Sequence, residues 1–188
     1  LNDVVKGGVV EPEPEPEPTP EEGVIFSETF GEPKKEGKYW PKVGAYTGYD
    51  NKDGVKFVDA TGVADVRSYK NNKGVVWFAA NKDSELEISG IKSQKGKLVL
   101  TYDLNANVYD PGTEIDLGVI EVYFNGKALK TESKVVSNAN GDQEKFYTLT
   151  IVEELESTSS DITLKFVSKA TTNTQGCRLD KIKLSIKK

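Results

Sequence analysis

The sequence predicts an all-β fold: an antiparallel, jelly-roll-like β-sandwich over residues 24–188, preceded by a disordered Pro/Glu linker over residues 1–23. Short runs rich in Val, Ile, Thr, Tyr and Phe alternate apolar and polar residues, and turn residues separate them about every 8–12 residues. No stretch shows the period of 3.6 residues that an amphipathic helix requires. An acidic, proline-rich segment stands before the first of these runs.

The linker is predicted from residues 11–20, which read Glu-Pro-Glu-Pro-Glu-Pro-Glu-Pro-Thr-Pro. Alternating proline favours extended polyproline II geometry, so this segment is expected to act as a solvated stalk. Seven acids and one lysine give residues 1–23 a net charge of −6, which leaves +1 for residues 24–188 out of the total of −5. The folded part therefore has no basic excess that would favour a nucleic-acid partner. Residues 1–10 fit the end of an upstream domain in a longer parent chain.

Missing residue types exclude several kinds of site. The chain has no histidine, which removes the commonest general base and every histidine-containing metal site. Cys177 is the one cysteine, so a disulfide within the chain is excluded, and a buried apolar role is expected for it. No apolar run reaches the length of about 18 residues that a membrane span needs. Because the chain also has no methionine, we expect an excised fragment or a mature segment, and any signal peptide or lipid anchor would lie upstream.

The expected strands follow one another as short elements separated by turns. They are residues 24–30, 55–59, 62–67, 74–80, 85–90, 97–108, 115–124, 127–131, 145–152, 161–168 and 177–187. Asn125-Gly126 predicts a type I′ hairpin, since both central residues of that turn need positive φ. In the last run the apolar positions change from odd to even between Leu179 and Ile182, which predicts a bulge at Asp180-Lys181.

The segment 97–109 offers a polar row that suits a ligand. One face carries apolar residues expected in the core, and the other carries Thr101, Asp103, Asn105, Asn107 and Tyr109. This second row fits either an ordinary solvated sheet face or a platform whose amides bind sugar hydroxyls.

Aromatic residues concentrate near the polar and glycine-rich stretch 38–54, which predicts an ordered loop. Tyr46 and Tyr49 are expected to be exposed there, and with Trp40 they would stack on the faces of sugar rings. Trp77 lies inside an apolar run and is expected to fill the core.

A calcium site is a further expectation. If both terminal strands lie in one sheet, the carboxylates of Glu28 and Asp180 would meet and suit a hard cation. The alternative is that both are surface charges, or that Asp180 pairs with Arg178 or a lysine.

Residues 114–121, Glu-Ile-Asp-Leu-Gly-Val-Ile-Glu, resemble the Glu-x-Asp-x-Glu strand of jelly-roll β-glucanases. Here Gly118 stands where the third acid belongs, and Glu121 falls on the opposite face of the strand. Retaining hydrolysis needs two carboxyl groups about 5–5.5 Å apart, so the motif does not support catalysis.

Several motifs together resemble one group of proteins: Phe26-Ser-Glu-Thr-Phe-Gly31, Tyr46-Thr-Gly-Tyr-Asp50, Val76-Trp-Phe78 and Arg178-Leu-Asp-Lys-Ile-Lys-Leu184. They resemble β-sandwich domains of surface lipoproteins in Bacteroidetes-type bacteria. The last motif is also similar to the closing strand of jelly-roll carbohydrate-binding modules. That resemblance implies a structural calcium held by Glu28 and Asp180.

The sequence therefore predicts a non-catalytic, extracytoplasmic module that binds polysaccharide or oligosaccharide at the cell surface. Trp40, Tyr46 and Tyr49 would stack on sugars, while Arg67, Asp103, Asn105 and Asn107 would form hydrogen bonds to them. The alternatives are a structural or protein-interaction spacer and, third, a degenerate glucanase-like hydrolase.

Overall fold

A computed structural model describes residues 8, 23–151, 155–157 and 160–187. The predicted Pro/Glu linker lies almost wholly outside these residues and stays a prediction. The described residues form one short 3-10 helix, η1 (Leu117–Val119), and fourteen strands. The strands are β1 (Val24–Glu28), β2 (Lys56–Val58), β3 (Asp65–Tyr69), β4 (Asn72–Phe78), β5 (Ser84–Ile91), β6 (Gly96–Ala106), β7 (Glu114–Asp116), β8 (Glu121–Phe124), β9 (Lys127–Ala128), β10 (Val135–Ser137), β11 (Tyr147–Thr150), β12 (Leu155–Ser157), β13 (Ile162–Ser168) and β14 (Cys177–Ile186).

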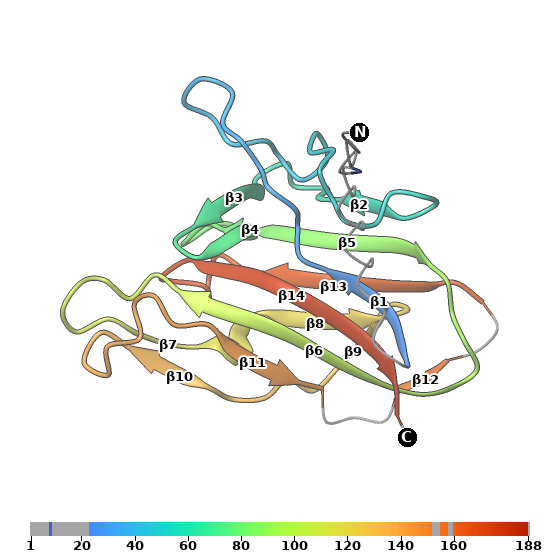
Figure 1. The fold of residues 1–188 in the computed structure, drawn as a ribbon. Helices are drawn as coiled ribbons and strands as arrows, with labels where there is room; N and C mark the ends of the chain where they lie inside the picture. Colours follow the sequence, from blue (N-terminus) through green and yellow to red (C-terminus); the bar gives the residue numbers. More distant parts are fainter. Residues whose placement is uncertain (1–7, 9–22, 152–154, 158–159, 188) are drawn as a thin grey trace, which may run out of the picture.

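Two antiparallel sheets form a sandwich, as the sequence predicts (Figure 1). The larger has seven strands in the order β11-β6-β14-β4-β3, with β1 added to β14 and β12 added to β6. The smaller has five strands in the order β2-β5-β13-β8-β9, and β7 pairs with β10 in a separate ribbon. In the described part of the chain, no helix has the length and hydrophobicity that a membrane crossing requires.

The core lies between the sheets and follows the period of two. The predicted inward row of residues 97–108 is buried, and Leu100, Tyr102 and Leu104 in β6 are fully inaccessible. The opposed sheet contributes residues such as Phe166, whose ring meets the Tyr102 ring edge-on at 5.3 Å. Alternation works here because successive strand residues point to opposite faces of a sheet.

Both predicted backbone irregularities are confirmed. Asn125 and Gly126 have φ angles of 48° and 82°, and they join β8 to β9 as the type I′ turn requires. The register of β14 against β6 shifts between Asp180 and Lys183, and Lys181 has a φ of 49°. The bulge returns Ile182 to the core while Asp180 stays on the outward face of the larger sheet.

The glucanase-like stretch does not form one strand. Helix η1 separates β7 from β8, so Asp116 and Glu121 belong to different elements. The Asp116 carboxylate caps η1 by accepting the Gly118 N–H at 2.7 Å, and it also binds Ser133 Oγ and Lys134 N. Burial alone would raise the pKa of Asp116, but the three hydrogen bonds to its charged form outweigh burial and lower the pKa.

Candidate functional site

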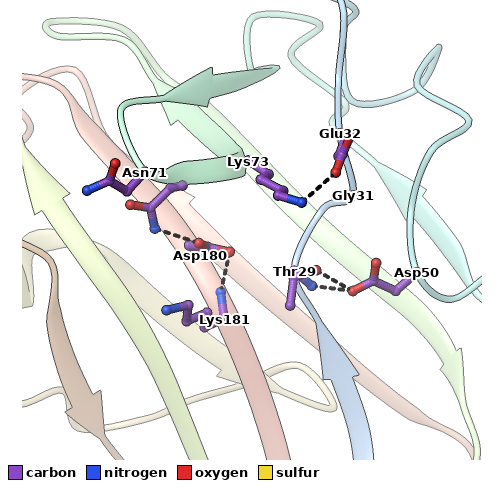
Figure 2. A pocket seen from close by; sticks show the side chains of 10 residues that line it. Thr29, Gly31, Glu32, Asp50, Asn71, Lys73, Asp180 and Lys181 are labelled. Atoms are coloured by element: carbon purple, nitrogen blue, oxygen red, sulfur yellow. Dashed lines mark hydrogen bonds and ion pairs between the residues drawn. The ribbon is translucent and has the colours of Figure 1, made fainter. Parts of the chain in front are cut away.

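A polar cleft opens where the bulge of β14 meets the start of β4 and the chain that leaves β1 (Figure 2). Its volume is about 520 Å³, within the range of small-ligand sites. We call it the Asp180 cleft. Its lining residues are Thr29, Gly31, Glu32, Asp50, Asn71, Asn72, Lys73, Gly74, Asp180 and Lys181.

Asp180 is the least exposed charged group of this cleft, at 3% of its full accessibility. The bulge aims its side chain outward, where Asn72 Nδ2 donates to Oδ2 at 2.7 Å. The Lys181 N–H donates to Oδ1, also at 2.7 Å. No lysine or arginine in the described part of the chain lies within ion-pair distance of this carboxylate. Asp180 is thus a buried anion held by two neutral donors.

Burial raises the pKa of Asp180 to about 6, although the bonds from Asn72 and Lys181 oppose this effect. The neighbouring Asp103, which lies opposite Asp180 on β6, raises the pKa further. A carboxyl group that is costly to ionise and lines a cleft is typical of a functional site.

The walls of the cleft are fixed by short contacts (Figure 2). Thr29 donates from both N and Oγ1 to Asp50 Oδ2, at 2.6 and 2.7 Å. Across the cleft, Lys73 Nζ lies 2.8 Å from Glu32 Oε1. The backbones approach closely at Gly74, where an added Cβ would lie 2.5 Å from the Phe30 carbonyl oxygen. The result is a hollow of hydroxyl, amide and charged groups.

The buried carboxylate of Glu28 holds the loop beside this cleft. It accepts the backbone N–H groups of Phe30, Asp50 and Asn51 at 2.7, 3.0 and 3.1 Å, and Asn51 Nδ2 at 3.1 Å. Burial raises the pKa of Glu28, against the lowering effect of these four bonds. Glu28 thereby positions Asp50 in the Asp180 cleft and Asn51 in the cleft described next.

The structure brings Tyr46 and Tyr49 together around a second hollow of about 300 Å³, which also includes Phe57 and Asn51. The exposure expected for Tyr49 is wrong. Its ring stacks on Phe57 at 3.6 Å, its hydroxyl donates to the Val43 carbonyl, and 6% of it is accessible. Tyr46 is half-buried and donates to the Phe30 carbonyl at 2.6 Å. The loop is folded onto its own aromatic rings because these fill the end of the core.

The predicted hydrogen-bonding residues lie on another surface, the outward face of the larger sheet. Asn105 is fully buried there, because the segment before β11 covers it and supplies the Gln143 and Lys145 carbonyls as acceptors at 3.1 and 2.8 Å. Its predicted exposure is therefore wrong. Asn107 is half-buried, and its Oδ1 accepts a bond from Arg178.

Two other members of the predicted set are half-buried on this face. Asp103 accepts the Thr148 hydroxyl at 2.6 Å. Arg67 is held by Asp65, with Nε 2.5 Å from Oδ1. Each polar group is therefore engaged by a neighbour within the chain.

Trp77 also lies on this outward face, so its expected place in the core is wrong. Its neighbours Val76 and Phe78 are fully buried, and alternation turns Trp77 to the opposite side. The Arg178 guanidinium lies 4.7 Å from the Trp77 ring centroid and 3.7 Å from that of Tyr69. Arg178 thus stacks between two rings, in a row that extends across β14, β4 and β3.

Trp40 stands apart from both groups. It is half-buried at the base of a loop, with Lys35 Nζ 5.3 Å from its ring centroid. The predicted stacking rings and the predicted hydrogen-bonding groups therefore do not form one hollow.

The calcium expectation does not fit the arrangement of Glu28 and Asp180. Strands β1 and β14 do pair, but Glu28 lies opposite Ile182 on the core face, whereas Asp180 points outward. Four N–H donors occupy the Glu28 carboxylate, which has about four acceptor positions. Among the described residues no group of three or more Asp, Glu, Cys or His could hold a metal ion.

Sequence reasoning missed the residues that complete the Asp180 cleft. Asn72 follows the turn after β3 and reads as an ordinary turn residue, and Asp50 reads as part of a glycine-rich loop. Two signals marked Asp180 itself: the change of phase in β14 and the resemblance of its last motif to the closing strand of carbohydrate-binding modules.

Comparisons with known proteins place the fold. No protein-family model matches the chain, and neither does any curated protein sequence. A family 35 carbohydrate-binding module from Clostridium thermocellum shares 13% identity at a TM-score of 0.50, over 70% of this chain and 92% of the module.

The xylan-binding domain CBM22-1 of Xyn10C from Paenibacillus barcinonensis shares 13% identity at a TM-score of 0.45, over 87% of this chain and 94% of that domain. The K3 cleaved adhesin domain of Lys-gingipain from Porphyromonas gingivalis shares 15% identity at a TM-score of 0.47, over 72% of this chain and 93% of that domain. The match to the family 35 module shows that the chain has a β-sandwich fold like that of carbohydrate-binding modules.

Proposed function

We propose that the chain is a non-catalytic glycan-binding module, displayed outside the cytoplasm on the Pro/Glu stalk of a surface protein, and that the Asp180 cleft holds the sugar. The proposal rests on one observation: the cleft surrounds a nearly buried carboxylate that has no lysine or arginine within ion-pair distance among the described residues. Its four acceptor positions meet two donors within the chain, which leaves capacity for ligand hydroxyls.

Sugar hydroxyls suit this carboxylate because they donate charge-assisted hydrogen bonds without bringing a charge of their own. Such bonds are about twice as strong as bonds between neutral groups. The Asn71 amide, the Thr29 hydroxyl and the Lys73 ammonium group surround the same space and offer further donors and acceptors. Because most of these groups also contact water, we expect modest affinity for each sugar unit.

Calorimetric titration of the whole chain against a panel of soluble polysaccharides and oligosaccharides tests this proposal. Asp180→Asn keeps the size of the side chain and removes its charge, and we expect it to weaken binding about tenfold, or about 1.4 kcal/mol. Glu114→Gln is the matched control, since Glu114 is exposed on β7. Binding to no glycan, or binding that is indifferent to Asp180→Asn, would remove the proposal.

Tyr46→Ala belongs in the same titration, because Tyr46 lines the neighbouring aromatic hollow. If this substitution abolishes binding and Asp180→Asn does not, the sugar binds in that hollow instead.

The second candidate is a structural or protein-interaction spacer. The arginine stack favours it, because Arg178 already covers the Tyr69 and Trp77 rings on the open sheet face. A folded chain that binds no member of the glycan panel is the result this candidate predicts.

A further inference from the structure

A hairpin of residues 34–40 stands away from both sheets, above the edge strand β3 in the view of Figure 1. Two backbone hydrogen bonds close it, from Glu36 N to Tyr39 O at 2.9 Å and from Tyr39 N to Glu36 O at 3.2 Å. Gly37 makes the turn with a φ of 63°. The Tyr39 side chain is 68% exposed, the highest value among the large hydrophobic residues described.

The hairpin carries a net charge of +2 around two aromatic rings, from three lysines and Glu36. Lys34, Lys35 and Lys38 are all exposed, and no described carboxylate lies within ion-pair distance of them. Lys35 Nζ and Lys38 Nζ each lie 5.3 Å from a ring centroid, of Trp40 and Tyr39 respectively. Such a surface suits a partner that combines negative charge with rigid apolar groups.

We propose that this hairpin binds the chain's own Glu-Pro run, residues 11–20. Polyproline II segments dock on exposed aromatic side chains, because their proline rings are apolar and their backbone has little entropy to lose. The run has four glutamates that alternate with prolines. With three residues per turn, a polyproline II helix of this sequence presents both residue types on every side. Prolines would pack on Tyr39 and Trp40 while glutamates pair with the lysines.

The length of the chain permits this contact. Residues 11–22 span about 37 Å in polyproline II geometry, at about 3.1 Å per residue. The base of the hairpin at Pro33 is ten residues from Gly23, so it lies at most about 36 Å away. Gly23 has a φ of 86°, in a turn that any returning segment requires. When the segment returns beside β1, the first residues of the run therefore reach the base of the hairpin.

This contact is separate from glycan binding, since residues 34–40 do not line the Asp180 cleft. Its consequence is mechanical. The stalk would leave the domain beside the hairpin rather than at the start of β1, and this would change how the domain presents the Asp180 cleft.

A nitroxide label on a Val10→Cys variant tests the contact in the whole chain. The native Cys177 is fully buried, so the label attaches to the introduced cysteine, next to an intact Glu-Pro run. We expect the amide resonances of residues 34–40 to lose at least half of their NMR intensity to paramagnetic broadening. Salt of about 1 M, where the Debye length falls to about 3 Å, should restore most of it.

Two variants separate charge pairing from random motion of the tail. Neutralising the hairpin with Lys34→Gln, Lys35→Gln and Lys38→Gln should remove the broadening. The matched control neutralises three exposed lysines elsewhere: Lys52→Gln, Lys56→Gln and Lys82→Gln. Broadening that is uniform over the surface, or that survives the hairpin substitutions, overturns the proposal. A mixture of labelled and unlabelled copies gives a further test. If the unlabelled copy is broadened as strongly as the labelled one, the proposal is overturned, because the occupant is then a second chain.

Discussion

Replacing Asp180 with asparagine should stabilise the fold at neutral pH while it weakens glycan binding. The Asp180 pKa is raised from 3.8 to about 6, because burial penalises its charged form. Ionising Asp180 therefore costs more free energy in the folded protein than in the unfolded chain. Removing the charge relieves that cost, and both existing hydrogen bonds can persist, since the Asn72 amide can rotate to present its oxygen.

The magnitude follows from the pKa difference. A pKa unit corresponds to about 1.36 kcal/mol, so the shift of Asp180 sets an upper bound of about 3 kcal/mol. Water in the cleft screens the charge, which reduces the expected gain to about 1–2 kcal/mol. For a domain of this size that gain raises the melting temperature by roughly 3–6 °C.

The dependence on pH gives the sign of the effect. Below a pH of about 3.8 the carboxyl group is protonated in both states, so its ionisation contributes nothing. As the pH rises from about 3.8 to about 6, the unfolded chain loses its proton first, and the wild type loses stability relative to Asp180→Asn. Urea denaturation of both proteins at several pH values measures this difference. An Asp180→Asn variant that is less stable at neutral pH, or a difference that does not grow across this window, would refute the reasoning.

Four further outcomes follow from contacts described above. Glu28→Ala leaves three backbone N–H groups without their acceptor, so we expect the free energy of unfolding by urea to fall by about 3 kcal/mol or more. Gly176→Ala should cost about 1–3 kcal/mol in the same assay, because the φ of 86° is strained for alanine and its Cβ would lie 2.2 Å from the Trp77 ring; an unchanged midpoint would contradict the close packing. Arg178→Lys should cost about 1 kcal/mol and alter the emission of Trp77, since an ammonium group cannot stack between two rings as a guanidinium does. Calcium and a chelator should give the same melting temperature, because N–H donors occupy Glu28; a clear rise with calcium would support the calcium site that the sequence implied.

Most of the fold was predictable because it depends on local patterns. Alternation identified the inward row of β6, and Asn125-Gly126 identified the hairpin of β8 and β9. The phase change in β14 located its bulge to the residue. Strands β10 and β12, with three residues each, were missed.

The candidate site was less predictable. Tyr49 and Asn105 have residue types and neighbours that suit exposure, yet Phe57 stacks on Tyr49 and the segment before β11 covers Asn105. Trp77 reads as a core residue in an apolar run, and the register of β4 turns it outward.

The sequence by itself determined the all-β class, the inward face of the main strands and the positions of the turn and the bulge. Each of these depends on residues that are close in sequence. Tertiary structure alone decided that Asp180 meets Asn72, which is 108 residues away, and that the predicted rings and amides lie on different surfaces. Pairing between strands that are far apart in the chain sets these distances. Alternation with a period of two predicts the face of the sheet on which a residue lies, but it does not predict which residues contact it there.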